Sequence, residues 1–214
     1  MKKSVAVLGL GKYGKSLSES LYRMGADVLA VDCNMKIIEE FTDKCTSAVC
    51  ANLENEEEVS ALGLKNMDVV VTAMGKNLAA SIMCITIAKE QGVKTVVSKI
   101  SSDRMASILK KVGADKVIDP EGEGGVRSAR IMLSSNFKDF YELDDNMYMI
   151  EMAPKPEWLG KDLIELNLRG NLGVNIVALR SKGKPFHFVD PKAVFSKDDI
   201  LLIVTEKNNK KFKL

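Results

Sequence analysis

The sequence predicts an α/β protein in which a doubly wound parallel sheet is followed by a smaller α+β domain. Two observations lead to this fold class. Short apolar runs alternate with helical patterns up to about residue 118, and the first run breaks into a glycine-rich turn that opens a helix. From residue 148 onward, short strands follow one another with turns between them. A length of 214 residues suits one large domain or two small ones.

The chain begins with the stretch around which the first domain is organised. An apolar run, Val5–Leu8, leads into Gly9-Leu10-Gly11-Lys12-Tyr13-Gly14 and a predicted helix over Lys15–Met24. A second run, Val28–Val31, ends on Asp32. Glycine lets the backbone approach a phosphate closely, the helix N-terminus attracts anions, and an acid in this position can accept hydrogen bonds from ribose hydroxyls. This order predicts a nucleotide site; the alternative is a βαβ unit whose glycines serve packing only.

The rest of the first domain repeats the alternation of strand and helix. Further strands are predicted at Ser47–Cys50, Val69–Ala73, Thr95–Ser98 and Lys116–Ile118, and further helices at Met35–Thr42, Glu56–Leu62, Leu78–Gln91 and Arg104–Lys111. Continuous apolar runs are typical of strands that are buried on both faces of a parallel sheet. Six strands with right-handed crossovers predict a Rossmann-type domain.

The pattern changes after residue 118. Residues 119–125 are predicted as a turn-rich segment, Val126–Ser135 as one more helix that crosses over to the next domain, and Asp139–Asp145 as an acidic connector. Short strands are then expected at Tyr148–Met152, Asn175–Arg180, Phe186–Phe188 and Ile200–Thr205, with short helices at Lys161–Leu166 and near the C-terminus. The predicted domains are residues 1–138 and 139–214.

Composition excludes several classes of protein. The net charge is only +2, which gives no support for nucleic-acid binding. No segment approaches the ~18 apolar residues of a membrane span, and the first apolar run is too short for a signal peptide. The four cysteines, Cys33, Cys45, Cys50 and Cys84, form no CxxC pair and are interpreted as buried thiols in a reducing cytoplasm.

Ligands of such sheets bind beyond the carboxyl ends of the strands, so the residues there are the candidate site. Lys12 could neutralise a phosphate, Asn52 could hydrogen-bond an adenine edge, and Glu121 could hold a divalent cation. The full predicted set is Gly9, Leu10, Gly11, Lys12, Tyr13, Gly14, Asp32, Cys33, Asn52, Leu53, Ala73, Met74, Gly75, Asn77, Lys99 and Glu121.

The sequence makes no case for catalysis. A dehydrogenase needs proton-transfer groups near its cofactor, and the one histidine, His187, falls in a predicted hairpin of the second domain. No GxSxG, HExxH or GxxxxGK[ST] motif is present. An NAD(P)-dependent oxidoreductase therefore remains only as the rival hypothesis to a regulatory protein.

Taken together, several motifs resemble the RCK (regulator of potassium conductance) proteins of the bacterial Ktr/Trk potassium-uptake systems. They are Val7 to Gly14, Val31-Asp32, Thr72-Ala73-Met74-Gly75, Gly113-Ala114-Asp115 and Asp119-Pro120-Glu121. The resemblance covers essentially the whole chain. It implies a nucleotide-binding RCK domain followed by a ligand-sensing RCK domain.

The resemblance also implies partners and ligands. Such proteins are cytoplasmic subunits that form dimers, commonly octameric rings, beneath a membrane-embedded potassium channel. An adenine nucleotide (ATP, ADP, AMP or NAD(H)) would bind the first domain, with a Mg, Ca or Na cation at Glu121. Many Ktr-type members have arginine where this chain has Lys12, which lacks the bidentate fork of arginine. Cyclic di-AMP would bind the second domain at Arg169, Gly170, Asn175, Ile176 and Pro191. A stand-alone nucleotide or redox sensor without a membrane partner is the third hypothesis.

Overall fold

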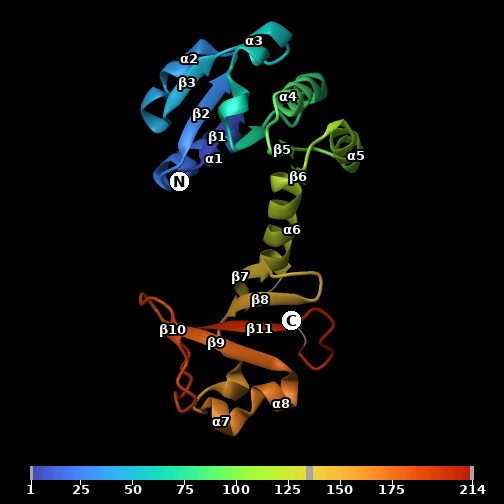
Figure 1. The fold of residues 1–214 in the computed structure, drawn as a ribbon. Helices are drawn as coiled ribbons and strands as arrows, with labels where there is room; N and C mark the ends of the chain where they lie inside the picture. Colours follow the sequence, from blue (N-terminus) through green and yellow to red (C-terminus); the bar gives the residue numbers. More distant parts are fainter. Residues whose placement is uncertain (1, 134–136, 213–214) are drawn as a thin grey trace. The chain divides into compact units, whose positions relative to one another are not determined.

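The computed structural model describes residues 2–133 and 137–212, which form two compact units (Figure 1). The units are Met1–Gly122 and Glu123–Leu214. Each is described by itself below. In the part of the chain that is described, no helix combines the length and the apolar character that a membrane span requires.

The first unit is built on the predicted parallel sheet. Its strands lie side by side in the order β3-β2-β1-β4-β5-β6, and every neighbouring pair is parallel. This is the order of a Rossmann-type fold, so the predicted fold class is confirmed. The strands are β1 (Ser4–Leu8), β2 (Asp27–Asp32), β3 (Ser47–Cys50), β4 (Val69–Thr72), β5 (Thr95–Lys99) and β6 (Lys116–Ile118).

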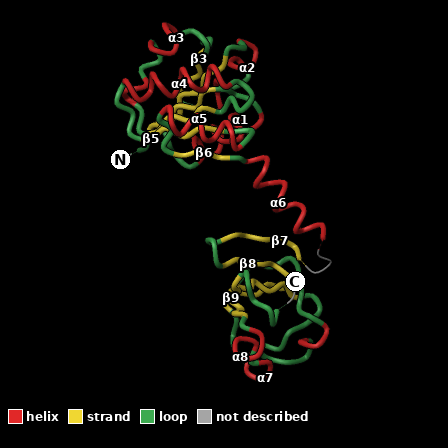
Figure 2. The backbone as a smooth tube through the Cα atoms, turned by 90° about the vertical axis from the view of Figure 1, so that its right-hand side faces the viewer, coloured by secondary structure: helices red, strands yellow, loops and turns green. Residues whose placement is uncertain are grey.

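Helices pack on both faces of this sheet (Figure 2). Side chains alternate along β1, so that Ala6 and Leu8 join one core with α3, α4 and α5, while Val5 and Val7 join another with α1 and α2. Burial of both faces explains why the strands read as continuous apolar runs. The helices are α1 (Lys12–Arg23), α2 (Met35–Glu39), α3 (Glu56–Ser60), α4 (Leu78–Glu90) and α5 (Asp103–Val112), with 3-10 turns η1 (Thr42–Lys44) and η2 (Leu64–Asn66).

The second unit is an antiparallel sheet with short helices against one face. Its strand order is β10-β9-β11-β8-β7, and its core contains Trp158, Phe195 and Ile203. The strands are β7 (Phe137–Glu142), β8 (Met147–Met152), β9 (Val174–Ser181), β10 (His187–Phe188) and β11 (Asp199–Glu206). The helices are α7 (Leu163–Leu166) and α8 (Leu168–Leu172), with the 3-10 turn η3 (Pro156–Trp158).

The helix α6 (Pro120–Leu133) starts earlier than the sequence predicts. The turn expected at residues 119–125 is wrong from Pro120 onward. Proline suits the first position of a helix, and the Asp119 carboxylate accepts the Gly122 N–H at 3.0 Å, so local capping outweighs the low helix propensity of three glycines. The end of the predicted helix, residues 134–135, lies outside the described residues.

Two further predictions are wrong. The acidic connector at Asp139–Asp145 is strand β7 up to Glu142, because Phe140 packs in the core and Asp139 has its own hydrogen-bond partners. No helix forms near the C-terminus among residues up to 212; the second short helix is instead α8, where Leu168 is buried. The predicted domain boundary after residue 138 stays a prediction, since α6 runs through the point where the two units divide.

Candidate functional site

The N-terminus of α1 lies at the carboxyl edge of the parallel sheet, directly after β1. Gly11 caps this helix without a side-chain hydrogen bond, and no acidic residue lies in its first turn. The N-terminal turn of a helix carries N–H groups without intrahelical partners and a positive partial charge. A Cβ placed on Gly11 would meet no atom within 4 Å. Nothing around Gly11 therefore obstructs an anion, and phosphate binding at this turn stays a prediction.

The two outer glycines have a different role from Gly11. Gly9 has a φ of +98°, and a Cβ there would lie 2.6 Å from Met74 Cγ. A Cβ on Gly14 would overlap the Gly9 carbonyl oxygen and lie 3.3 Å from Ala73 Cβ. These positions let α1 pack closely against the ends of β1 and β4. Part of the glycine motif thus serves packing, which was the alternative explanation for it.

Asp32 ends β2 and ties the glycine turn in place. One carboxylate oxygen accepts the Leu10 N–H at 2.7 Å, and the other accepts the Asn34 N–H at 2.9 Å. Each carboxylate oxygen has a further lone pair, so these bonds leave acceptor capacity for a ribose hydroxyl. The acid predicted to bind ribose therefore also shapes the phosphate turn.

Glu54, which the sequence analysis did not single out, joins the loops after β3 and β4. Asn77 caps α4 by accepting the Ala80 N–H at 3.0 Å, and its amide nitrogen donates to Glu54. The Glu54 N–H in turn donates to Asn52 Oδ1 at 3.0 Å. Asn52 and Asn77 are thus held near one another through Glu54. The side chain of Leu53 is buried in the core, so only its backbone can face a ligand.

Lys99, the last residue of β5, reaches toward two other parts of the predicted site. Its Nζ donates to Glu121 Oε1 at 2.6 Å and lies 5.7 Å from the centre of the Tyr13 ring. Its side-chain carbons pack 3.4 Å from where a Cβ on Gly75 would be. The hydrogen bond from Lys99 lowers the pKa of Glu121, and the charge of Lys76 adds to this effect. Lys12, by contrast, is exposed.

The cysteine prediction is half wrong. Cys45 and Cys84 are buried, and burial raises the pKa of the Cys84 thiol to about 12. Cys33 and Cys50 are exposed. They follow or end the strands β2 and β3 at the sheet edge, where side chains leave the core. Among the described residues, no group of three or more His, Cys, Asp or Glu side chains could hold a metal ion.

The second unit holds the other predicted site. A depression of about 170 Å³ brings Arg169, Asn175 and Ile176 together. Gly170 follows Arg169 in α8, and the Pro191 carbonyl accepts the Leu163 N–H at 3.1 Å, next to this depression. The remaining lining residues are Leu163, Asn167, Leu168 and Val174. His187 is exposed on β10.

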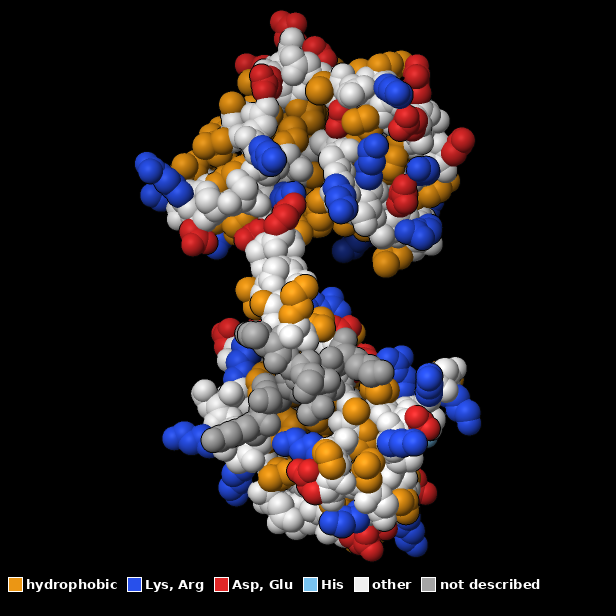
Figure 3. Space-filling view, turned by 180° about the vertical axis from the view of Figure 1, so that it is seen from behind, with side chains coloured by type: hydrophobic (Ala, Val, Ile, Leu, Met, Phe, Trp, Pro, Cys, Tyr) orange, Lys and Arg blue, Asp and Glu red, His pale blue; other side chains and the backbone are white. Residues whose placement is uncertain are grey.

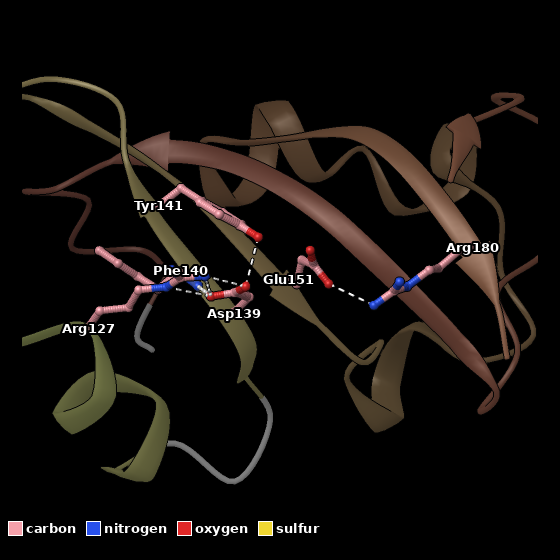
Figure 4. A network of polar contacts seen from close by, with 6 residues as sticks. All are labelled: Arg127, Asp139, Phe140, Tyr141, Glu151 and Arg180. Carbon is pink, nitrogen blue, oxygen red and sulfur yellow. Dashed lines mark hydrogen bonds and ion pairs between the residues drawn. The ribbon is translucent and has the colours of Figure 1, made fainter. Parts of the chain in front are cut away.

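A polar network that the sequence did not reveal joins α6 to β7 (Figure 4). Arg127 donates to both carboxylate oxygens of Asp139, at 2.6 Å each, and Tyr141 Oη donates to Asp139 at 2.7 Å. Burial raises the pKa of Asp139, but these hydrogen bonds outweigh it and hold the pKa below its usual range. Farther along the same sheet, Arg180 donates to Glu151 at 2.9 Å.

Comparison with known proteins identifies the family. The TrkA-N domain matches residues 5–120, and the TrkA-C domain matches residues 147–213. The chain belongs to the TrkA family of RCK-domain proteins. Ktr system potassium uptake protein C of Bacillus subtilis is 35% identical over 95% of this chain and 92% of its own length. Ktr system potassium uptake protein A of Vibrio alginolyticus is 34% identical over 94% of this chain and 92% of its own length.

Solved structures show the same fold as this TrkA-family chain. The GsuK RCK domain superposes with a TM-score of 0.67 at 13% identity and covers 98% of this chain. The GsuK channel bound to NAD gives a TM-score of 0.68 at 12% identity over 98% of this chain. This chain spans 46% and 38% of those two chains, respectively. The likeness to these structures concerns the fold alone.

Proposed function

We propose that this chain is a regulatory subunit of a potassium-uptake system and that an adenine nucleotide bound at the glycine turn sets its state. The observation that carries the proposal is the 35% identity, over nearly the full length of both chains, to a Ktr system potassium uptake protein. The open α1 N-terminus and Asp32 supply a phosphate site and a ribose acceptor next to each other.

The proposed subunit is not an enzyme. It works in the cytoplasm at the inner face of the membrane, through a membrane-embedded potassium channel subunit. Nucleotides can shift its conformation only by binding two states with different affinity. Candidate nucleotides are ATP, ADP, AMP and NAD(H). NAD is supported as a candidate because one solved structure of similar fold is the GsuK channel bound to NAD.

Binding of the nucleotides to the purified chain tests this function. We expect micromolar or tighter binding of at least one of ATP, ADP and NADH by calorimetry, with different affinities among them. We also expect NADH to remain unoxidised in the complex, because the proposal assigns no hydride acceptor. Co-purification of a membrane potassium-transport subunit from detergent extract tests the partner. Absence of binding to ATP, ADP, NADH and also AMP would rule out control by an adenine nucleotide.

Two finer parts of the proposal concern other ligands. Glu121 is the candidate for holding a cation, and the depression at Arg169 is the candidate for cyclic di-AMP. Arg169 is exposed in α8, so its guanidinium can reach a phosphate, while Ile176 supplies an apolar wall. A loss of cyclic di-AMP binding in Arg169→Gln with retention of nucleotide binding would support two separate sites.

A further inference from the structure

Lys99 is held at the proposed phosphate site in an unusual state for a lysine. Its side chain is only 14% exposed, whereas lysine is among the residues most often found in solvent. Its carbon stem passes beside Gly75, and the Tyr13 ring lies 5.7 Å from its ammonium. Tyr13 belongs to the first turn of α1. The ammonium is therefore already positioned beside the glycine turn, without the ordering that the exposed Lys12 would need.

The partner of Lys99 is much more exposed than Lys99 itself. The side chain of Glu121 is 68% exposed, against 14% for Lys99. If the pair opens, water can solvate the carboxylate readily, but the ammonium of the largely buried Lys99 side chain needs another anion nearby. A phosphate at the α1 N-terminus could supply that anion. This asymmetry makes the contact exchangeable rather than a fixed structural bridge.

Glu121 lies in the first turn of α6, which Asp119 caps. The Lys99–Glu121 contact thus ties the end of β5 to the start of α6. Release of Glu121 would remove this tie while leaving the cap intact. Helix α6 continues into the second unit. A conformational change in its first turn, caused by nucleotide binding, can therefore affect the second unit through this helix.

We propose that Lys99 is the residue that recognises the nucleotide phosphates and that it exchanges Glu121 for them, which frees the first turn of α6. The inference rests on the proposed nucleotide function and assigns its recognition and coupling to this ion pair. Lys12 has a secondary role. The ligand class is an adenine nucleotide carrying a phosphate chain, and adenosine should not trigger the exchange.

The two partners of the pair should have opposite effects on binding. Lys99→Gln should weaken ADP and ATP binding about tenfold or more, because a charge-assisted hydrogen bond is lost, and should leave adenosine binding nearly unchanged. Glu121→Gln should tighten ADP binding about threefold, because Lys99 no longer has to leave a carboxylate. Lys99→Arg should restore most of the affinity. Lys94→Gln, which changes an exposed lysine just before β5, at the opposite end of the strand from Lys99, is the matched control.

Calorimetry with ADP, ATP and adenosine, together with hydrogen exchange of residues 120–126, decides the matter. In the unmodified chain ADP should raise exchange in the first turn of α6; in Glu121→Gln exchange should be high already and insensitive to ADP. Unchanged ADP affinity in Lys99→Gln, or weaker affinity in Glu121→Gln, overturns the exchange. Equal losses for ADP and adenosine in Lys99→Gln also overturn it, since they indicate a packing defect. Nucleotide binding by the unmodified chain in these cases leaves the proposed function standing.

Discussion

Gly11 and Gly14 belong to one motif, but a methyl group would have opposite consequences at the two positions. At Gly14 it would overlap the Gly9 carbonyl oxygen, which belongs to the backbone and cannot simply rotate away. At Gly11 it would point into open space, and the φ of −62° suits alanine. The fold therefore requires glycine at position 14 but not at position 11, where the proposed phosphate site gives the reason for glycine.

This difference predicts a separation of stability from binding. Gly14→Ala should destabilise the first unit by about 3 kcal/mol, as overpacking against a rigid backbone does. Gly11→Ala should unfold like the unmodified chain but lose most of its ADP affinity, because the methyl group occupies the path of the phosphate. Thermal unfolding and calorimetry on both variants test this. Normal ADP binding by Gly11→Ala would place the phosphate elsewhere.

Strand β7 is held to α6 by a cluster of charged and polar side chains around Asp139. The Asp139 carboxylate accepts hydrogen bonds from the Arg127 guanidinium of α6, from Tyr141 Oη of its own strand and from the Phe140 N–H at 2.8 Å. The pKa of Asp139 is lower in the folded chain than in the unfolded chain. Its contribution to stability is therefore complete above the unfolded pKa, about 4, and is lost as the pH falls through the folded value.

We therefore expect acid to loosen the junction of α6 and β7. Protection of β7 and β8 amides from hydrogen exchange, corrected for intrinsic rates, should fall below about pH 4. Asp139→Asn should lower this protection at pH 7, and its difference from the unmodified chain should shrink as the pH falls through the folded pKa of Asp139. Asp145→Asn, at an exposed carboxylate just beyond β7, serves as the control. A pH-independent difference between Asp139→Asn and the unmodified chain would contradict the ionic explanation.

At the scale of the whole molecule, the first unit was predictable and the second only partly so. Runs such as Val69–Val71 are apolar because both faces of the parallel sheet are covered, and this signal is strong. In strand β7, Asp139 and Tyr141 flank the buried Phe140, so the strand reads in the sequence as part of a polar segment. Helix α8 has only five residues, too few to show a period.

The candidate site shows the same limit. Sequence order identified Lys99 and Glu121 separately, because each follows a strand at the carboxyl edge. It could not show that they contact one another, since that depends on β5 lying beside β6 and on the conformation of the residues after them. Glu54 was missed because its role comes from a contact with Asn77 on a separate loop.

The exposed apolar side chains of α6 carry a prediction about assembly. Val126 is 52% exposed and Met132 is 83% exposed, and apolar side chains are visible along this helix in Figure 3. We expect a second copy of the chain to cover them in a homodimer, from which a ring can be built. Met132→Glu should therefore lower the molar mass in light scattering. Met24→Glu, at an 82% exposed methionine of the first unit, should not. Equal masses for both variants would contradict this interface.

The strand order of the first unit also bears on how the chain folds as it is made. β1 leaves the ribosome before both of its neighbours in the sheet, β2 and β4, and β4 emerges only after the three helices α1, α2 and α3 have been synthesised. The edge of β1 that will pair with β4 must stay unpaired during that time, and unpaired strand edges can pair with other chains. In the second unit, β7 and β8 pair across a short turn and can form at once. Slowing translation after β4 should thus raise the yield of the correctly folded first unit more than that of the second.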